Sequence, residues 1–180
     1  MKNDEHTLVL GGCKSGKSRY AQSLCEKLSS EKRLYVATCV PLDGEMHERV
    51  KKHQDDRDMT WNTLEEPIEI ADGIRAAGKT SGVILVDCLT LWLTNMLLND
   101  METEAIFDKV EGLILAIVES PCPVVLVSNE VGAGIVPENA LARRFRDLAG
   151  CVNQKIAQAL DRVVLTVAGL PMILKGQTLV

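Results

Sequence analysis

The sequence predicts an α/β protein in which a mostly parallel sheet is flanked by helices within a single domain. Short apolar runs alternate with longer segments of helical periodicity, which implies right-handed crossovers between parallel strands. The runs are almost continuously apolar, as in strands buried on both faces of a sheet. A chain of 180 residues with 46% hydrophobic content is long enough for one sizeable core and requires no second domain.

Five apolar runs are predicted as strands: Thr7–Leu10, Arg33–Val40, Val83–Cys88, Val124–Ser128 and Arg162–Ala168. Five helices are predicted between them: Arg19–Leu28, Glu45–Asp55, Ile68–Ala77, Leu91–Leu98 and Ala105–Glu119. The longest helical pattern starts at Pro137, which suits a first turn, and runs to Ala159, with a possible kink at Gly150.

Composition favours a small-molecule ligand over nucleic acid. The net charge is −5 and there are only six aromatic residues, whereas a nucleic-acid binder needs a basic face and stacking platforms. The six cysteines show no C-x-x-C pair, which indicates free thiols in a reducing compartment. The polar N-terminus does not resemble a signal peptide, and no apolar stretch reaches 18 residues. We therefore expect a soluble, cytoplasmic protein without a membrane span.

The most informative motif follows the first predicted strand. Residues 11–18 match G-x-x-x-x-G-K-[ST] and consist of Gly11, Gly12, Cys13, Lys14, Ser15, Gly16, Lys17 and Ser18. Its glycines let successive backbone N–H groups point at one phosphate chain, and the helix that follows adds its positive dipole end. Lys17 would contact the terminal phosphates, and Ser18 would offer a hydroxyl to Mg²⁺. The alternative is a glycine-rich turn without a ligand, but the flanking strand and helix favour a P-loop NTPase of the RecA-like kind.

Ligands of such sheets gather beyond the carboxyl ends of the strands, and three further strand ends are polar. Ala37, Thr38 and Cys39 are small enough to let a nucleotide approach, although such residues also serve packing alone. Asp87 follows four apolar residues, the pattern of a carboxylate that holds Mg²⁺ beside Ser18. The competing interpretation of Asp87 is a helix cap, a role that Thr90 could fill instead. The third end, Ser128–Glu130, opens into a glycine-rich loop, and its polar groups are expected to face the site.

The helix predicted over Glu45–Asp55 carries an inward-facing histidine. At 100° per residue, Met46, Val50, His53 and Arg57 fall within about 60° of one another. A lone histidine on an apolar stripe is usually a core residue, but Arg57 on the same stripe needs an anion to meet its charge. An imidazole beside a nucleotide α-phosphate can act as a nucleophile, as a general base or as an electrostatic contact. His47 lies about 100° away from the stripe and does not compete.

These motifs together resemble the bifunctional adenosylcobinamide kinase / adenosylcobinamide-phosphate guanylyltransferases of cobalamin biosynthesis. The resemblance covers essentially the whole chain. It is carried by residues 11–21, Tyr35–Thr38, the His53 to Pro67 segment, Asp87–Trp92 and, most specifically, Val127–Asn139 continuing to Gly150.

The resemblance implies two reactions at one nucleotide site. The aminopropanol hydroxyl of adenosylcobinamide is phosphorylated with ATP or GTP, and GMP is then transferred from GTP to that phosphate, with release of pyrophosphate. His53 matches the histidine that carries GMP in the family, and Glu65 and the Thr38 segment match residues near the nucleotide. The resemblance also implies that Met172–Val180 completes the sheet edge and that the protein is a homo-oligomer, a trimer in the family.

Two rival functions belong to other classes. A regulatory GTPase would carry an Asn/Thr-Lys-x-Asp motif, and no such tetrapeptide occurs. A single-activity small-molecule or nucleotide kinase would use the same phosphate loop and leave His53 structural. The position of Cys13, often small in relatives, is expected to make the nucleotide site sensitive to thiol modification.

Overall fold

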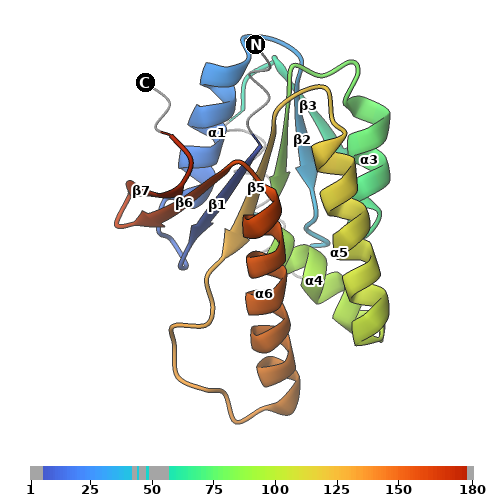
Figure 1. The fold of residues 1–180 in the computed structure, drawn as a ribbon, viewed down its shortest axis with the longest axis vertical. Helices are drawn as coiled ribbons and strands as arrows, with labels where there is room; N and C mark the ends of the chain where they lie inside the picture. The colour runs from blue at the N-terminus through green and yellow to red at the C-terminus, as the bar shows by residue number, and fades with distance from the viewer. Residues whose placement is uncertain (1–5, 42–43, 45–47, 49–56, 178–180) are drawn as a thin grey trace.

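The protein forms a seven-stranded sheet with the spatial order β3-β2-β4-β5-β1-β6-β7 (Figure 1). The computed structural model describes residues 6–41, 44, 48 and 57–177. The strands are Thr7–Gly11 (β1), Arg33–Ala37 (β2), Trp61–Glu65 (β3), Val83–Asp87 (β4), Val124–Asn129 (β5), Arg162–Val167 (β6) and Leu170–Lys175 (β7). All neighbouring pairs are parallel except β6 and β7, so the mostly parallel sheet predicted from the sequence is confirmed.

Helices cover both faces of the sheet. Those described are Lys17–Leu28 (α1), Ile70–Ala77 (α3), Leu89–Leu98 (α4), Thr103–Val118 (α5) and Ala140–Ala159 (α6). Ala21, Leu24 and Cys25 of α1 pack on one face against Val9, Val125 and other inward residues. The remaining four helices pack on the opposite face, where Trp92, Ile106 and Val152 join one large apolar cluster. The alternation of inward residues along each strand therefore divides the core into two layers.

Two strands were not predicted from apolar runs, because both lie at the edges of the sheet. The strand β3 reads Trp-Asn-Thr-Leu-Glu, and only its Trp61 is buried. The strand β7 is mostly exposed and antiparallel, and it supplies the edge that the family resemblance implied near the C-terminus. The predictions that the second, third and last predicted strands reach Val40, Cys88 and Ala168 were wrong by one to three residues.

The start predicted for the last helix was also wrong. The helix α6 begins at Ala140, and Asn139 caps it by accepting a hydrogen bond from Ala142 N at 3.0 Å. Pro137 therefore lies before the helix, since the asparagine supplies the capping oxygen. Gly150 lies within the continuous helix. The helix predicted over Glu45–Asp55 lies almost entirely outside the described residues, as does His53.

A tight hairpin between β6 and β7 supports the first loop of the sheet. Ala168 and Gly169 both have positive φ values, 51° and 80°, as a two-residue hairpin turn requires. Gly169 N donates to Ser15 O at 2.9 Å, and a Cβ atom on Gly16 would lie 3.1 Å from Gly169 Cα. The turn therefore packs backbone to backbone against residues 12–16.

None of the helices in the described parts of the chain is long and apolar enough to cross a membrane.

Candidate nucleotide site

The loop between β1 and α1 is a compact turn whose backbone is shaped by glycines. Gly16 has a φ of 94° and immediately precedes α1, while Ser15 N donates to Gly12 O at 3.3 Å. A Cβ atom on Gly11 would collide with the hydroxyls of Ser15 and Thr166 and lie 2.8 Å from Thr166 O. Glycine is thus required at Gly11 by space and favoured at Gly16 by backbone conformation.

Lys17 starts α1 and reaches back over this turn. Its Nζ atom donates to Gly12 O at 3.2 Å. The ammonium group is therefore held near the backbone amides at which the turn and the helix N-terminus present positive partial charge, an arrangement suited to a phosphate chain.

A cavity of about 450 Å³ opens beside the turn, within the size range of small-molecule sites. It brings together residues predicted from four separate parts of the sequence. The predicted site residues that line it are Cys13, Lys17, Ser18, Ala37, Cys39, Arg57, Glu65 and Asp87.

Of the predicted site residues that the structure describes, the remaining ones do not line this cavity with their side chains. Gly11, Gly12, Lys14 and Gly16 shape the turn itself, and the Ser15 hydroxyl lies 2.9 Å from that of Thr166.

Thr38, predicted to contact the nucleotide, instead ties two strand ends together. Its side chain is fully buried, and its hydroxyl accepts from Cys88 N and donates to Cys88 O, both at 2.8 Å. The hydroxyl makes its hydrogen bonds inside the protein because β2 and β4 are neighbours. The local sequence does not reveal this pairing.

Asp87 lies at the carboxyl end of β4 and is not a helix cap. The N-cap of α4 is Cys88, and no side chain makes a capping hydrogen bond there. Asp87 lines the cavity together with Ser18, as expected of the carboxylate predicted to hold a cation.

Tyr35, which sequence reasoning missed, contacts both Arg57 and Asp87. The Arg57 guanidinium carbon lies 3.8 Å from the centroid of the Tyr35 ring, close enough for a cation–π contact. Burial, followed by the charge of Asp87, raises the pKa of Tyr35 well above its ordinary value, and the hydroxyl is hydrogen-bonded to the Asp87 carboxylate. Arg57 therefore faces the cavity, the orientation expected for it from the sequence, although the helix on which that expectation was based lies almost entirely outside the described residues. The sequence signals for Tyr35 were a phenol at the centre of an apolar strand and its place in the Tyr35–Thr38 segment that carries the family resemblance.

Further polar residues of the cavity come from β3, α4 and β5. They are Thr63, Thr90, Thr94 and Asn129. The strand end Ser128–Glu130 was expected to face the site, and Asn129 does so, whereas the Ser128 hydroxyl donates to Asn153 Oδ1 at 2.7 Å.

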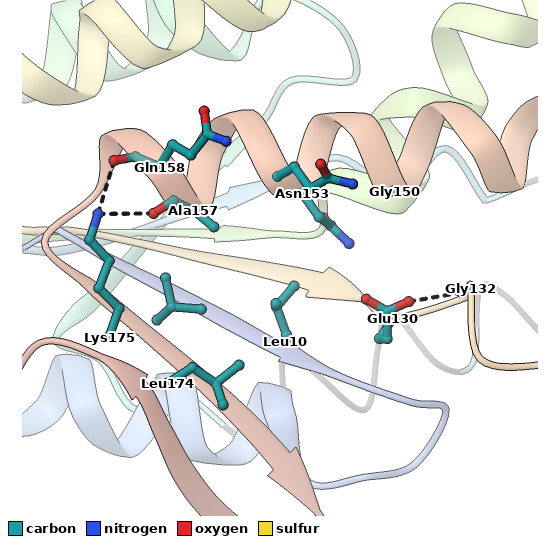
Figure 2. Close-up of a pocket in the computed structure, with 11 residues that line it drawn as sticks. Leu10, Glu130, Gly132, Gly150, Asn153, Ala157, Gln158, Leu174 and Lys175 are labelled. Atoms are coloured by element: carbon teal, nitrogen blue, oxygen red, sulfur yellow. Dashed lines mark hydrogen bonds between the residues drawn. The ribbon is translucent and has the colours of Figure 1, made fainter.

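A second cavity, of about 780 Å³, lies between α6 and the edge of the sheet (Figure 2). Figure 2 shows Lys175 donating to the carbonyl oxygens of Ala157 and Gln158, where α6 ends, at 3.1 and 2.9 Å. None of the residues of the phosphate-binding turn lines this cavity, so it is distinct from the nucleotide site.

The sheet order, the glycine turn with Lys17 and the acidic end of β4 define a P-loop nucleotide-binding protein of the RecA-like kind. Solved structures agree on the fold. The match to a KaiC-like protein of Pyrococcus horikoshii covers 90% of this chain and 70% of that protein, with a TM-score of 0.55 and 11% sequence identity. The match to the flagellar accessory protein FlaH of Methanocaldococcus jannaschii covers 98% of this chain and 80% of that protein, with a TM-score of 0.54 and 15% sequence identity.

Sequence comparison identifies the family. The family described as cobinamide kinase / cobinamide phosphate guanyltransferase matches residues 7–174, and the chain belongs to it. The bifunctional adenosylcobalamin biosynthesis protein CobP of Pseudomonas aeruginosa is 46% identical over 175 residues, which are 96% of this chain and 98% of that protein. The bifunctional adenosylcobalamin biosynthesis protein CobU of Salmonella typhimurium is 43% identical over 180 residues, 93% of this chain and 98% of that protein.

Proposed function

We propose that this protein catalyses both reactions of its family at the cavity beside the glycine turn. It phosphorylates the aminopropanol hydroxyl of adenosylcobinamide with ATP or GTP, and it then transfers GMP from GTP to that phosphate to give adenosylcobinamide-GDP and pyrophosphate. The observation that carries the proposal is the convergence of Lys17, Arg57 and Asp87 on one cavity in a chain of this family.

Two cationic side chains that line the cavity would bind the triphosphate. Lys17 extends from the start of α1, and Arg57 rests on the ring of Tyr35. Charge on the transferring phosphates redistributes in either reaction, and cationic side chains stabilise that charge. These side chains therefore support phosphoryl and guanylyl transfer alike.

Ser18 and Asp87 are the residues that would hold Mg²⁺. The two side chains line the same cavity and present only oxygen atoms. In the described ranges no group of three or more His, Cys, Asp and Glu side chains could enclose a metal ion. A hydroxyl and one carboxylate fit Mg²⁺, which keeps several waters and takes further ligands from phosphates. When bound, the ion would neutralise charge on the phosphate oxygens.

His53 is the proposed nucleophile of guanylyl transfer, although it lies outside the described residues. An imidazole nitrogen would form a bond to the α-phosphorus as the bond to pyrophosphate breaks, and the phosphate of the substrate would then displace the histidine. The proposal is supported by Arg57, four residues further along the chain, whose side chain reaches the cavity.

The test is covalent labelling. The protein is incubated with GTP labelled at the α-phosphate and with Mg²⁺, quenched, and examined for acid-labile, base-stable label. We expect the parent and His47→Ala to be labelled, whereas His53→Ala should take up none and should keep some phosphoryl transfer. Equal labelling of His53→Ala would exclude the covalent role of His53, whereas a parent protein that takes up no label would favour the rival function, a single-activity kinase.

We also propose that the chain folds as one domain and assembles as a homo-oligomer, a trimer by family resemblance. Supporting an assembly, Val167, Leu170, Met172 and Leu174 at the outer edge of the sheet are each more than half exposed. Light scattering should give a mass of three chains. Use of nucleoside triphosphates favours a cytoplasmic location.

A further inference from the structure

One oxygen atom in the nucleotide cavity is buried without a hydrogen-bond partner. It is Oδ1 of Asn129, which makes no hydrogen bond to any residue in the ranges 6–41, 44, 48 and 57–177. Buried acceptors are almost always paired in folded proteins, because an unpaired one has lost its water without compensation. The atom therefore points to a donor that arrives with the ligand.

Asn129 lies between the phosphate-binding turn and Asp87. Its strand, β5, is flanked by β1 and β4, and Asn129 pairs in register with Gly11, the first residue of the turn. Asp87 pairs with Val127, two residues earlier on the same strand. The amide consequently lines the cavity on the side where Lys17 and Asp87 would meet the terminal phosphates.

The direction of Oδ1 is fixed by the other contacts of the residue. Asn129 Nδ2 donates to the Thr90 hydroxyl at 3.1 Å, and this hydroxyl lies 3.1 Å from Cys88 Sγ. The backbone carbonyl oxygen of Asn129 accepts from Nδ2 of Asn153, which lies on α6, at 3.1 Å. A side-chain amide held through its Nδ2, on a residue whose backbone is also anchored, is preorganised to accept a hydrogen bond in a set geometry.

The missing donor cannot be a phosphate, because the inner phosphates and most of the terminal one carry no hydrogen at neutral pH. The reacting hydroxyl of the second substrate is a donor, and it must approach the terminal phosphorus. We propose that Asn129 Oδ1 accepts a hydrogen bond from the substrate hydroxyl that attacks the terminal phosphate, an inference that rests on the kinase activity proposed above. Asn129 would then be a catalytic residue of phosphoryl transfer.

Asn129 would orient the substrate hydroxyl and would not remove its proton. The hydroxyl oxygen forms a bond to the terminal phosphorus while the bond to the bridging oxygen breaks and the nucleoside diphosphate leaves with the electron pair. The hydroxyl proton passes to a phosphate oxygen or to water, since an amide oxygen is too weak a base to keep it. Guanylyl transfer takes place at the α-phosphorus and uses no hydroxyl nucleophile, so it does not need this contact.

The experiment compares both reactions in the same variants. Phosphoryl transfer is measured with adenosylcobinamide and ATP, and guanylyl transfer with GTP and separately prepared adenosylcobinamide phosphate. In Asn129→Ala we expect kcat for phosphoryl transfer to fall about 10-fold, the effect of one lost orienting hydrogen bond, with guanylyl transfer changed less than about 3-fold. Asn129→Leu, which keeps the side-chain volume, should show the same split if the alanine variant folds poorly.

The matched control is Asn153→Ala, which removes an amide from the same hydrogen-bonded cluster outside the nucleotide cavity. It should lower both activities in equal proportion. If the Asn129 variants lose both activities equally, the inference is overturned, whether or not they also need more Mg²⁺. Unchanged phosphoryl transfer in these variants would overturn it as well. A parent protein without kinase activity would instead refute the proposed function.

Discussion

At the scale of single residues, neutral side chains orient the charged side chains of the nucleotide cavity. Tyr35 offers its ring to Arg57 and its hydroxyl to Asp87. Thr38 joins β2 to the backbone of Cys88, the residue directly after Asp87. Tyr35 thus orients charged groups that would meet the triphosphate, and Thr38 fixes the backbone beside one of them.

Lys17→Ala should abolish both reactions. The ammonium group lies over the glycine turn, and no other described residue of that turn brings a lysine side chain to the cavity. We expect kcat/KM for each reaction to fall at least about 100-fold, as when a group that stabilises developing charge is removed. Lys27→Ala, on an exposed position of the last turn of the same helix, should retain the parent rates. Retained kinase turnover in Lys17→Ala would contradict the phosphate-binding role of the loop.

At the scale of elements, the turn between β1 and α1 tolerates an extra methyl group at one glycine and excludes it at the other. A Cβ atom on Gly11 collides with Ser15 and Thr166, whereas nothing lies within 4 Å of one on Gly12. Gly11→Ala should cost about 1–3 kcal/mol, or roughly 3–10 °C in Tm for a chain of this size. Gly12→Ala should unfold close to the parent temperature in the same thermal scan. Equal Tm values for the two variants would show that the turn relaxes freely.

The interior elements could be predicted from the sequence because burial on both faces leaves a continuous apolar run. The runs in β1, β4 and β5 are of this kind, and the glycine motif located the site beyond the end of β1. The edge strand β3 could not be found in this way, since polar residues are tolerated where one side of a strand faces solvent.

Contacts between residues that are far apart in the sequence could not be predicted either. Tyr35 meets Asp87 because β2 lies beside β4 in the folded sheet, and the same pairing lets the Thr38 hydroxyl bond to the backbone of Cys88. Arg57 does reach the cavity, but the helical periodicity from which this was expected is not tested, because that segment lies almost entirely outside the described residues. The position of His53 relative to the cavity stays a prediction.

At the scale of the whole molecule, a buried thiol should make the free energy of unfolding fall at alkaline pH. Burial raises the pKa of Cys25 far above its ordinary value of 9.0. Below pH 9 the thiol is protonated in both states and stability is unaffected. Above pH 9 the unfolded chain releases the proton while the folded one keeps it, so the free energy of unfolding falls by up to about 1.4 kcal/mol per pH unit for this group.

Urea unfolding at pH 8, 9 and 10 checks this expectation. Cys25→Ala should lose less stability than the parent between pH 9 and 10. Cys151→Ala removes an exposed thiol and should follow the parent curve. A Cys25→Ala variant with the parental pH dependence would show that this thiol is not kept protonated by the fold.

The hairpin turn at Gly169 connects the outer edge of the sheet to the glycine turn between β1 and α1. Its backbone touches Gly16 and is hydrogen-bonded to Ser15, and the strand beyond it, β7, displays apolar side chains outward. A neighbouring subunit seated on that strand would brace the loop that grips the triphosphate. Association of subunits and tightness of nucleotide binding would then rise and fall together, although no residue of one chain need enter the site of another.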